Sequence, residues 1–190
     1  MKRKLERFRE LNDEIRGCRK CRLWKTRKNA LPGEGDISSD LMLIAQAPGE
    51  TENEQGKMFV GPSGGVLDEL LSKSGIGRDG LFMTNLLKCM LPGYRRPRHD
   101  EIEACSSFLD KEIQLVDPAL LCPLGYYSTR YLFEKYEIRN KLEFPEICGD
   151  ILSLSDRKIL PLGHPAAILY DESIKDEMVE HYKVLGDKKP

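Results

Sequence analysis

The chain has 190 residues, which is enough for one ordinary domain, and we treat residues 1–190 as a single domain. Hydrophobic residues make up 40% and charged residues 32%, a balance that predicts an apolar core and excludes wholesale disorder. No run of about 18 uncharged apolar residues is present, and the charged N-terminus lacks the apolar segment of a secretory signal. We therefore expect a cytoplasmic monomer without a membrane partner.

Charge is unevenly distributed along the chain, although the formal net charge is −1. Residues 1–29 contain twelve Lys or Arg and four Asp or Glu, whereas the remainder is acidic overall. A second basic segment at 94–99 (YRRPRH) interrupts the acidic part. Concentrated basic patches bind phosphates in some proteins and are solvated surface in others. Charge alone leaves both interpretations open.

Hydrophobic periodicity predicts helices that alternate with short apolar strands. In chain order we expect helices at 2–15, 64–74, 100–116, 128–136 and 173–184, and strands at 40–46, 81–87, 119–124 and 158–162. This alternation is typical of an α/β fold with a parallel sheet covered on both faces. Ligands bind beyond the carboxyl ends of such strands, so we expect a site where the segments 46–54, 84–88 and 163–168 converge.

Four of the six cysteines form a candidate metal site. Cys18 and Cys21 make a Cys-x2-Cys pair, and Cys89 and Cys105 follow farther along the chain. Reduced thiols are the norm inside cells, and four thiolates suit zinc or an iron–sulfur cluster. The spacing does not decide between these metals, and four unrelated buried thiols remain an alternative. The other two cysteines stand in apolar surroundings and are predicted to be structural.

Four features at the expected site each have a functional and an ordinary interpretation. The segment 45–49 (AQAPG) either offers backbone N–H groups to a carbonyl or anion or forms a plain turn. Phe59 either stacks on a planar ligand or fills the core under a loop. Asn85 either reads adjacent donor and acceptor atoms, as on uracil, or satisfies backbone groups. His164 either stabilises negative charge on a leaving group or is structural.

The order and spacing of these motifs resemble the uracil-DNA glycosylase superfamily, and most of all its iron–sulfur branch, family 4. The similar segments are the Cys-x2-Cys pair, AQAPG at 45–49, FVGPSG at 59–64, TNLLKC at 84–89, EIEAC at 101–105 and HPA at 164–166. The resemblance implies a three-layer α/β/α sandwich around a four-stranded parallel sheet. It also implies a [4Fe–4S] cluster on Cys18, Cys21, Cys89 and Cys105.

The activity implied by this resemblance is base excision repair, in which uracil is flipped out of single- or double-stranded DNA and hydrolysed from its sugar. Backbone N–H groups near Gln46 and Ala47 would hold uracil O2, and Phe59 would stack on the ring. Asn85 would read N3–H and O4, while His164 would stabilise charge on O2 as the bond breaks.

Further roles follow from the same resemblance. Glu52 would lie near the C5 edge of the base, where it excludes the methyl group of thymine. Residues expected to contact DNA are Arg95, Arg96 and Arg98 in the basic segment, and Ile168 with Leu169, which would fill the gap left by the flipped nucleotide.

The sequence departs from the family pattern at the position of the usual water-activating carboxylate. Gln46 stands where family 4 usually has Glu, although the cofactor-free family 1 enzymes also have Gln there. Ala47 stands where the family 1 enzymes have Asp, a residue that family 4 also lacks. We therefore expect a dissociative mechanism, driven by leaving-group stabilisation from His164 and backbone dipoles. Two alternatives are a catalytically silent uracil- or DNA-binding module, and a protein that crosslinks to the abasic sugar through His99 of the basic segment.

Overall fold

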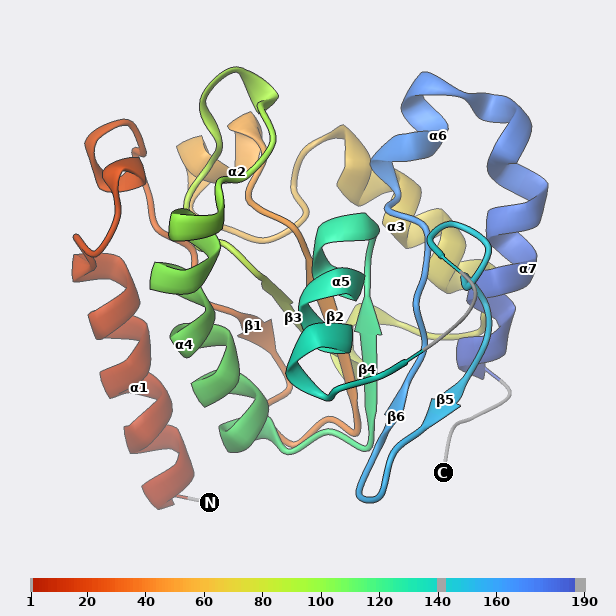
Figure 1. Cartoon of the computed structure of the whole chain (residues 1–190), viewed down its shortest axis with the longest axis horizontal. Coiled ribbons are helices and arrows are strands. Elements are labelled where there is room, and N and C mark those ends of the chain that lie inside the picture. The colour runs from red at the N-terminus through yellow and green to blue at the C-terminus, as the bar shows by residue number, and fades with distance from the viewer. Residues whose placement is uncertain (1, 140–142, 187–190) are drawn as a thin grey trace.

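The computed structural model describes residues 2–139 and 143–186. A central sheet lies between two layers of helices, which confirms the expected three-layer α/β/α architecture (Figure 1). Its four central strands are parallel, in the order β3 (Phe82–Asn85), β2 (Leu41–Ala45), β4 (Leu120–Pro123) and β6 (Lys158–Ile159). All four lie within the apolar runs that predicted them.

The sheet is larger than the four strands expected from the resemblance. A short strand β1 (Glu34–Gly35) pairs antiparallel with β3, and β5 (Leu152–Ser153) pairs antiparallel with β6. The sheet therefore has six strands. Each added strand is two residues long, which is too short to show the alternation of apolar and polar residues by which a strand is recognised.

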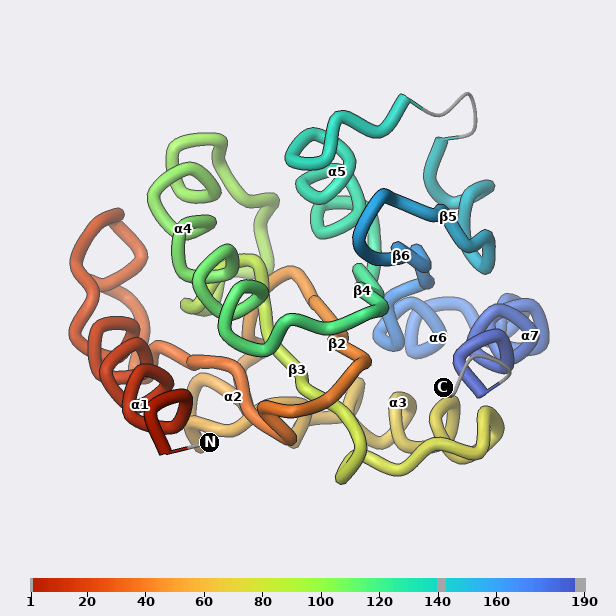
Figure 2. Tube along the Cα trace, turned by 90° about the horizontal axis from the view of Figure 1, so that it is seen from below, coloured from red at the N-terminus to blue at the C-terminus, as the bar shows by residue number. Residues whose placement is uncertain are grey.

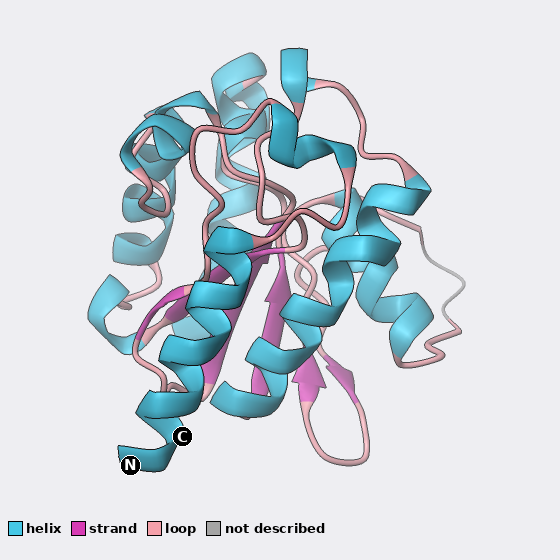
Figure 3. Cartoon of the chain, turned by 90° about the vertical axis from the view of Figure 1, so that its left-hand side faces the viewer, coloured by secondary structure: helices cyan, strands magenta, loops and turns pink. Residues whose placement is uncertain are grey.

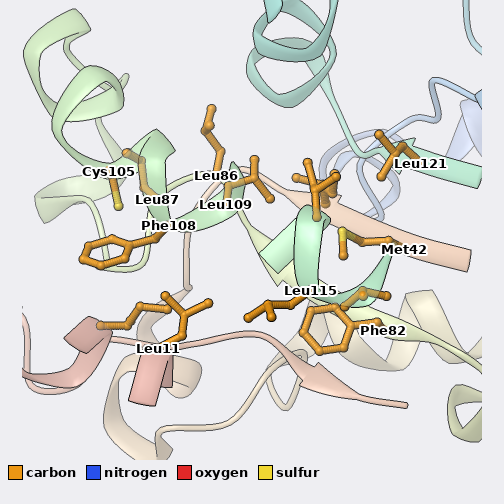
Figure 4. Packing of buried hydrophobic residues seen from close by; sticks show 14 of the residues in the cluster. Leu11, Met42, Phe82, Leu86, Leu87, Cys105, Phe108, Leu109, Leu115 and Leu121 are labelled. Carbon is orange, nitrogen blue, oxygen red and sulfur yellow. The ribbon is translucent and has the colours of Figure 1, made fainter. Parts of the chain in front are cut away.

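One face of the sheet is covered by α1 (Lys2–Gly17), α4 (His99–Val116) and α5 (Tyr126–Lys135). In the view from below, α4 and α5 lie on one side of the strands and α1 lies next to α4 (Figure 2). Met42 and Ile44 of β2 point into this layer and pack in one buried cluster with Phe108 of α4 and Leu11 of α1. Figure 4 shows this cluster, with Cys105 and Phe108 from α4 near Leu11.

The other face is covered by α3 (Pro62–Lys73) and α7 (Lys175–Gly186). Leu43 and Ala45 of β2 point into this second core, where they join Leu67 of α3 and Tyr182 of α7. Neighbouring residues of β2 thus enter opposite cores, because side chains alternate along a strand. A strand that is apolar on both faces reads as a continuous hydrophobic run, which is why β2 was recognisable in the sequence.

Short helices and loops gather at the carboxyl ends of the parallel strands (Figures 1 and 3). They are η1 (Arg22–Lys25), α2 (Glu50–Gln55), η3 (Pro92–Tyr94), α6 (Ala166–Tyr170) and η4 (Glu172–Ile174). A further short helix, η2 (Arg78–Gly80), precedes β3.

Across the part of the chain that the structure describes, no helix combines the length and the apolar character needed to cross a membrane.

Candidate active site

A cavity of about 470 Å³ lies at the carboxyl ends of β2 and β3. Residues 45–52, Asn85 and His164 line it, so the three loop segments predicted from the sequence do converge. Further lining residues come from the segments 58–63 and 91–95 and from α6. Gln46, Ala47, Glu52, Phe59, Asn85 and His164 are all among them.

Asn85 is the last residue of β3, and its side chain is almost fully buried, at 2% exposure. Its amide Nδ2 donates a hydrogen bond to the sulfur of Met58 at 3.1 Å. A thioether is a weak acceptor, so this amide group gains little from its present partner. A ligand in the cavity can therefore take over the hydrogen bond of the Asn85 amide, because little free energy is lost when the contact with Met58 is broken.

The backbone of Asn85 is held from the other side by the buried side chain of Lys88. The Lys88 Nζ donates to the Asn85 carbonyl oxygen at 2.8 Å and to Thr84 Oγ1 at 2.7 Å. It also pairs with Glu112 Oε2 at 2.6 Å, and Glu112 Oε1 accepts from the Gly33 N–H at 2.8 Å. Lys88 was not predicted to be a site residue, although a lysine in the apolar run 81–89 is a signal of such a buried role.

His164 follows the last parallel strand and lies partly buried in the cavity wall. The backbone N–H of Ala166 donates to its Nδ1 at 3.1 Å. Burial lowers the pKa of His164 to about 4, and the nearby charge of Glu52 offsets this only in part. The imidazole is therefore neutral at pH 7. Because Nδ1 accepts a hydrogen bond, the single ring proton lies on Nε2 and can be donated.

Phe59 lies near His164, with ring centroids 6.3 Å apart and ring planes inclined by 32°. It lines the cavity and also belongs to the apolar core, at 6% exposure. Its backbone has a φ of +50°, an uncommon conformation for a bulky residue. Arg78 stabilises this turn, because its Nη2 donates to the carbonyl oxygens of Phe59 at 2.9 Å and Gly64 at 3.0 Å.

Gly64 is required by the same turn. A Cβ atom at this position would lie 1.9 Å from the Phe59 carbonyl oxygen, a distance at which backbone atoms clash. The turn is further held at Met58, whose N–H donates to Glu34 Oε1 at 3.1 Å. The position of the Phe59 ring is thus fixed by several contacts remote from the cavity. Arg78 and Glu34 were not predicted from the sequence.

Glu52 is a buried carboxylate in α2, with 7% exposure. Its Oε1 accepts a hydrogen bond from the Gly61 N–H at 2.7 Å. Added Cβ atoms at Gly49 and Gly61 would lie 2.6 and 3.1 Å from its two oxygens, so these glycines leave the room that the carboxylate occupies. Glu52 therefore joins the beginning of α2 to the beginning of α3, and its charge reaches His164.

Ile168 and Leu169, both expected to contact DNA, lie in different surroundings. Ile168 is 9% exposed and packs in the core beneath α6, whereas its neighbour Leu169 is 51% exposed. Consecutive residues of a helix point in directions about 100° apart, and in α6 this turns Ile168 toward the core and Leu169 outward. Leu169 lines the cavity mouth together with the exposed side chains of Tyr170 and Tyr94.

The basic segment 94–99 divides into paired and exposed side chains. Arg95 donates to both carboxylate oxygens of Glu101, at 2.9 and 2.5 Å, and this pairing lowers the pKa of the fully buried Glu101. Arg95 is thus engaged within the protein, although it also lines the cavity. Arg96 and Arg98 are exposed. His99 is exposed at the start of α4 and is outside the cavity lining.

The four candidate metal ligands all lie in or beside the hydrophobic core that includes residues of α1 and α4. Cys89 and Cys105 are buried members of that core, and Cys18 and Cys21 pack against it. Three of the sulfurs accept N–H hydrogen bonds: Cys18 from the Lys20 backbone at 3.4 Å, Cys105 from the Lys88 backbone at 3.3 Å and Cys89 from the Arg27 guanidinium at 3.2 Å. Such donors suit sulfurs that carry negative charge.

All six cysteines are unbridged thiols. Within residues 2–139 and 143–186, no three His, Cys, Asp or Glu side chains converge closely enough to hold one metal ion. A [4Fe–4S] cluster has a different requirement, because each cysteine sulfur binds its own iron atom. Four soft ligands in or beside one hydrophobic cluster, with N–H groups directed at three of the sulfurs, fit such a cluster.

Comparisons with known proteins agree with this architecture. The family model described as "Uracil DNA glycosylase superfamily" matches residues 32–185. A type-4 uracil-DNA glycosylase of Saccharolobus solfataricus is 42% identical over 176 residues, covering 90% of this chain and 81% of that protein. A type-4 uracil-DNA glycosylase of Archaeoglobus fulgidus is 31% identical over 190 residues, covering 96% of this chain and 94% of that protein.

Proposed function

This chain belongs to the uracil DNA glycosylase superfamily, and we propose that its cavity receives a uracil flipped out of DNA and holds it while the bond to the sugar breaks. Similarity to type-4 enzymes over most of both chains identifies it as a uracil-DNA glycosylase of DNA repair. The roles of individual residues below are our proposal. They rest on the contacts and burial of the residues that line the cavity.

The observation that carries base recognition is the buried Asn85 amide with a thioether as its partner. Uracil presents an N–H donor at N3 beside a carbonyl acceptor at O4. One amide group can accept from the first and donate to the second. When uracil binds, Asn85 Nδ2 donates to O4 in place of the Met58 sulfur, so a strong acceptor replaces a weak one. Phe59 then supplies an apolar ring for stacking, worth about 1–3 kcal/mol per base.

Bond cleavage is assisted by the neutral His164. As the C1′–N1 bond breaks, its electron pair moves onto the uracil ring and places negative charge on O2. The Nε2 proton of His164 hydrogen-bonds this oxygen, and backbone N–H groups near Gln46 and Ala47 contribute further dipoles. Water then attacks C1′ of the positively charged sugar and loses a proton to solvent, and the uracil anion gains a proton from solvent. The products are uracil and an abasic site.

No step in this proposal uses a carboxylate as general base. Gln46 has no ionisable group, and Glu52 accepts the Gly61 N–H inside the α2–α3 junction. Glu52 contributes instead by holding the loop that carries Phe59 and by its charge near the cationic sugar. Glu52 lines the cavity. Its predicted position near the C5 edge of the base is therefore compatible with both contributions.

The [4Fe–4S] cluster is proposed on Cys18, Cys21, Cys89 and Cys105. When bound, the cluster supplies a covalent link among the segment after α1, the end of β3 and α4. The Lys88 backbone N–H bonds the Cys105 sulfur while the Lys88 side chain holds the Asn85 carbonyl. These contacts connect Cys105 with Asn85 through Lys88, which supports a structural role for the proposed cluster near the residue proposed to read the base.

DNA contacts are proposed at the rim of the cavity. Leu169 and Tyr170 are exposed on α6 and are positioned to occupy the space that the flipped nucleotide vacates. The exposed side chains of Arg96 and Arg98 are suited to phosphate contacts. Arg95 is assigned to Glu101 rather than to DNA.

Strand scission distinguishes this function from a silent uracil- or DNA-binding module. The protein is incubated with a uracil-containing oligonucleotide and with a matched thymine oligonucleotide, and both are then treated with alkali. Scission at the uracil alone indicates that an abasic site was formed. Binding without scission would support the silent module, and a complex that survives denaturation and requires His99 would support crosslinking.

A further inference from the structure

A second hollow, with a volume of about 380 Å³, lies beside the turn between α1 and η1. Its lining includes Trp24 and the basic residues Arg16, Arg19, Arg27 and Lys28. Among the described residues, no Asp or Glu lines it. We call this hollow the Trp24 groove. Basic side chains grouped around an aromatic ring are the composition of surfaces that bind single-stranded nucleic acid.

Trp24 is the only tryptophan in the sequence, and it is 37% exposed. The exposed Arg19 places its guanidinium carbon 5.0 Å from the centre of the indole ring. Arg19 is absent from the ion pairs found among the described residues, whereas Lys28 pairs with Glu54. A guanidinium next to an aromatic ring can bind a phosphate while the indole stacks on a base.

The Trp24 groove is joined to the active-site cavity by α2. The backbone N–H groups of Lys28 and Asn29 donate to Asn53 Oδ1 at 2.9 and 3.2 Å, so the groove segment is fixed to this helix. The first residues of α2 line the cavity, and Gly56, just beyond its end, lines the groove. Figure 1 shows the turn after α1 and α2 at the same end of the sheet.

The length of α2 sets the spacing between the two sites. Six helical residues rise by about 9 Å. The end of α2 at the groove is therefore about 9 Å from its end at the cavity, a separation that a few nucleotides of the strand carrying the uracil can span.

We propose that the Trp24 groove binds single-stranded DNA flanking the uracil, with a phosphate on Arg19 and an unpaired base stacked on Trp24. This inference rests on the function proposed above, since the same strand must place its uracil in the cavity. Stacking requires a base that is unpaired, so the groove favours a single-stranded flank over a duplex flank.

The single tryptophan makes the groove directly observable. The protein is titrated with single-stranded oligonucleotides that carry a non-cleavable 2′-fluorinated deoxyuridine, while tryptophan emission and binding are recorded. One oligonucleotide ends beside the uridine, and others extend several nucleotides to the 5′ or the 3′ side. We expect quenching of Trp24 by one of the two extended strands and much less by the short one. The same extension as a duplex should quench less than the single strand.

Variants separate the groove from the cavity. Trp24→Ala should weaken binding of the extended strand by about 5- to 150-fold, the range for loss of one base–aromatic stack. Arg19→Ala, at an exposed position, should reduce the difference in affinity between the extended and the short oligonucleotide. This variant keeps Trp24 as the fluorescent reporter. Tyr126→Ala is the matched control, because Tyr126 is also an exposed aromatic with an arginine, Arg130, at 3.2 Å from its hydroxyl.

The outcomes distinguish this inference from the function on which it rests. Normal excision of uracil with no response of Trp24 to either extension would overturn the groove and leave the function intact. Equal quenching by single-stranded and duplex extensions would overturn the stacking assignment. Failure to excise uracil from any ordinary deoxyuridine substrate would overturn the proposed function itself.

Discussion

Lys88 and Glu112 form an ion pair inside the protein, with Nζ 2.6 Å from Oε2 and side chains that are 1% and 0% exposed. The pair links β3 to α4 and shares hydrogen bonds with Thr84 and with the Asn85 carbonyl. A buried charge is tolerated when its partner and additional hydrogen bonds satisfy it. This pair therefore fixes the end of β3, from which Asn85, the residue that we propose reads the base, extends.

Loss of one partner should be more harmful than loss of both charges. Lys88→Met leaves the Glu112 carboxylate buried without its cation, and should lower the free energy of unfolding by about 3–5 kcal/mol. The double variant Lys88→Met/Glu112→Gln keeps an acceptor for the Gly33 N–H and removes the charge, so it should recover part of this loss. Urea unfolding of the wild type, both single variants and the double variant measures the coupling. Additive losses would show that the two charges do not stabilise each other.

The metal site should be visible in the purified protein. We expect a brown colour with broad absorbance, which Cys18→Ala abolishes because one of four thiolate ligands is lost. Cys148→Ala is a matched control, since Cys148 is a buried thiol outside the quartet. Iron and sulfide analysis should follow the colour. A colourless protein with stoichiometric zinc and full activity would contradict the cluster.

The long apolar elements of this fold could be predicted because each has a continuous hydrophobic signal. The strand at 40–46 and the helix at 100–116 illustrate this for the two element types. The helix α2 was missed because its sequence ETENEQ is polar throughout and shows no apolar face. Its position depends on the buried Glu52, whose carboxylate accepts a hydrogen bond from the Gly61 N–H outside the helix, and this is a tertiary contact.

The position of the candidate cavity and several of its lining residues could be predicted, but the contacts that support those residues could not. The rule that ligands bind at the carboxyl ends of parallel strands brought Gln46, Asn85 and His164 to one cavity. The sequence could not show that Ile168 faces inward and Leu169 outward, because both are apolar neighbours on a five-residue helix. Nor could it show that Arg95 pairs with Glu101, which depends on the turn before α4.

Asn85 should determine which base is excised. Asn85→Asp should weaken uracil excision and raise activity on cytosine, because a protonated or rotated carboxyl presents a different order of donor and acceptor. Sites that hydrogen-bond their substrate can reject a mispatterned analogue by roughly 10⁴-fold. Asn53→Asp, another buried amide, should leave base preference unchanged. Wild-type uracil kinetics in Asn85→Ala would show that the amide is purely structural.

His164 should remain neutral well below pH 6.5. Burial lowers its pKa to about 4, so the unfolded chain binds a proton between pH 6.5 and 4 that the folded chain does not. Stability contributed by this group is therefore lost as the pH falls through that window. Nitrogen-15 NMR of the three histidines, assigned with His164→Gln, should show a neutral ring with its proton on Nε2. A proton on Nδ1, or titration near pH 6.5, would contradict the donor assignment.

The most direct test of the account is a comparison of single-turnover excision rates for His164→Ala, Glu50→Gln and Glu52→Gln. Single-turnover conditions separate bond cleavage from slow product release. Loss of one preorganised donor to a developing oxyanion costs about 100- to 1000-fold in rate, and we expect that reduction for His164→Ala with DNA affinity nearly unchanged. Each glutamine variant should lose less, because neither carboxylate is assigned to activate water. If either one abolishes excision while His164→Ala is mild, that glutamate is the general base and the dissociative mechanism is wrong.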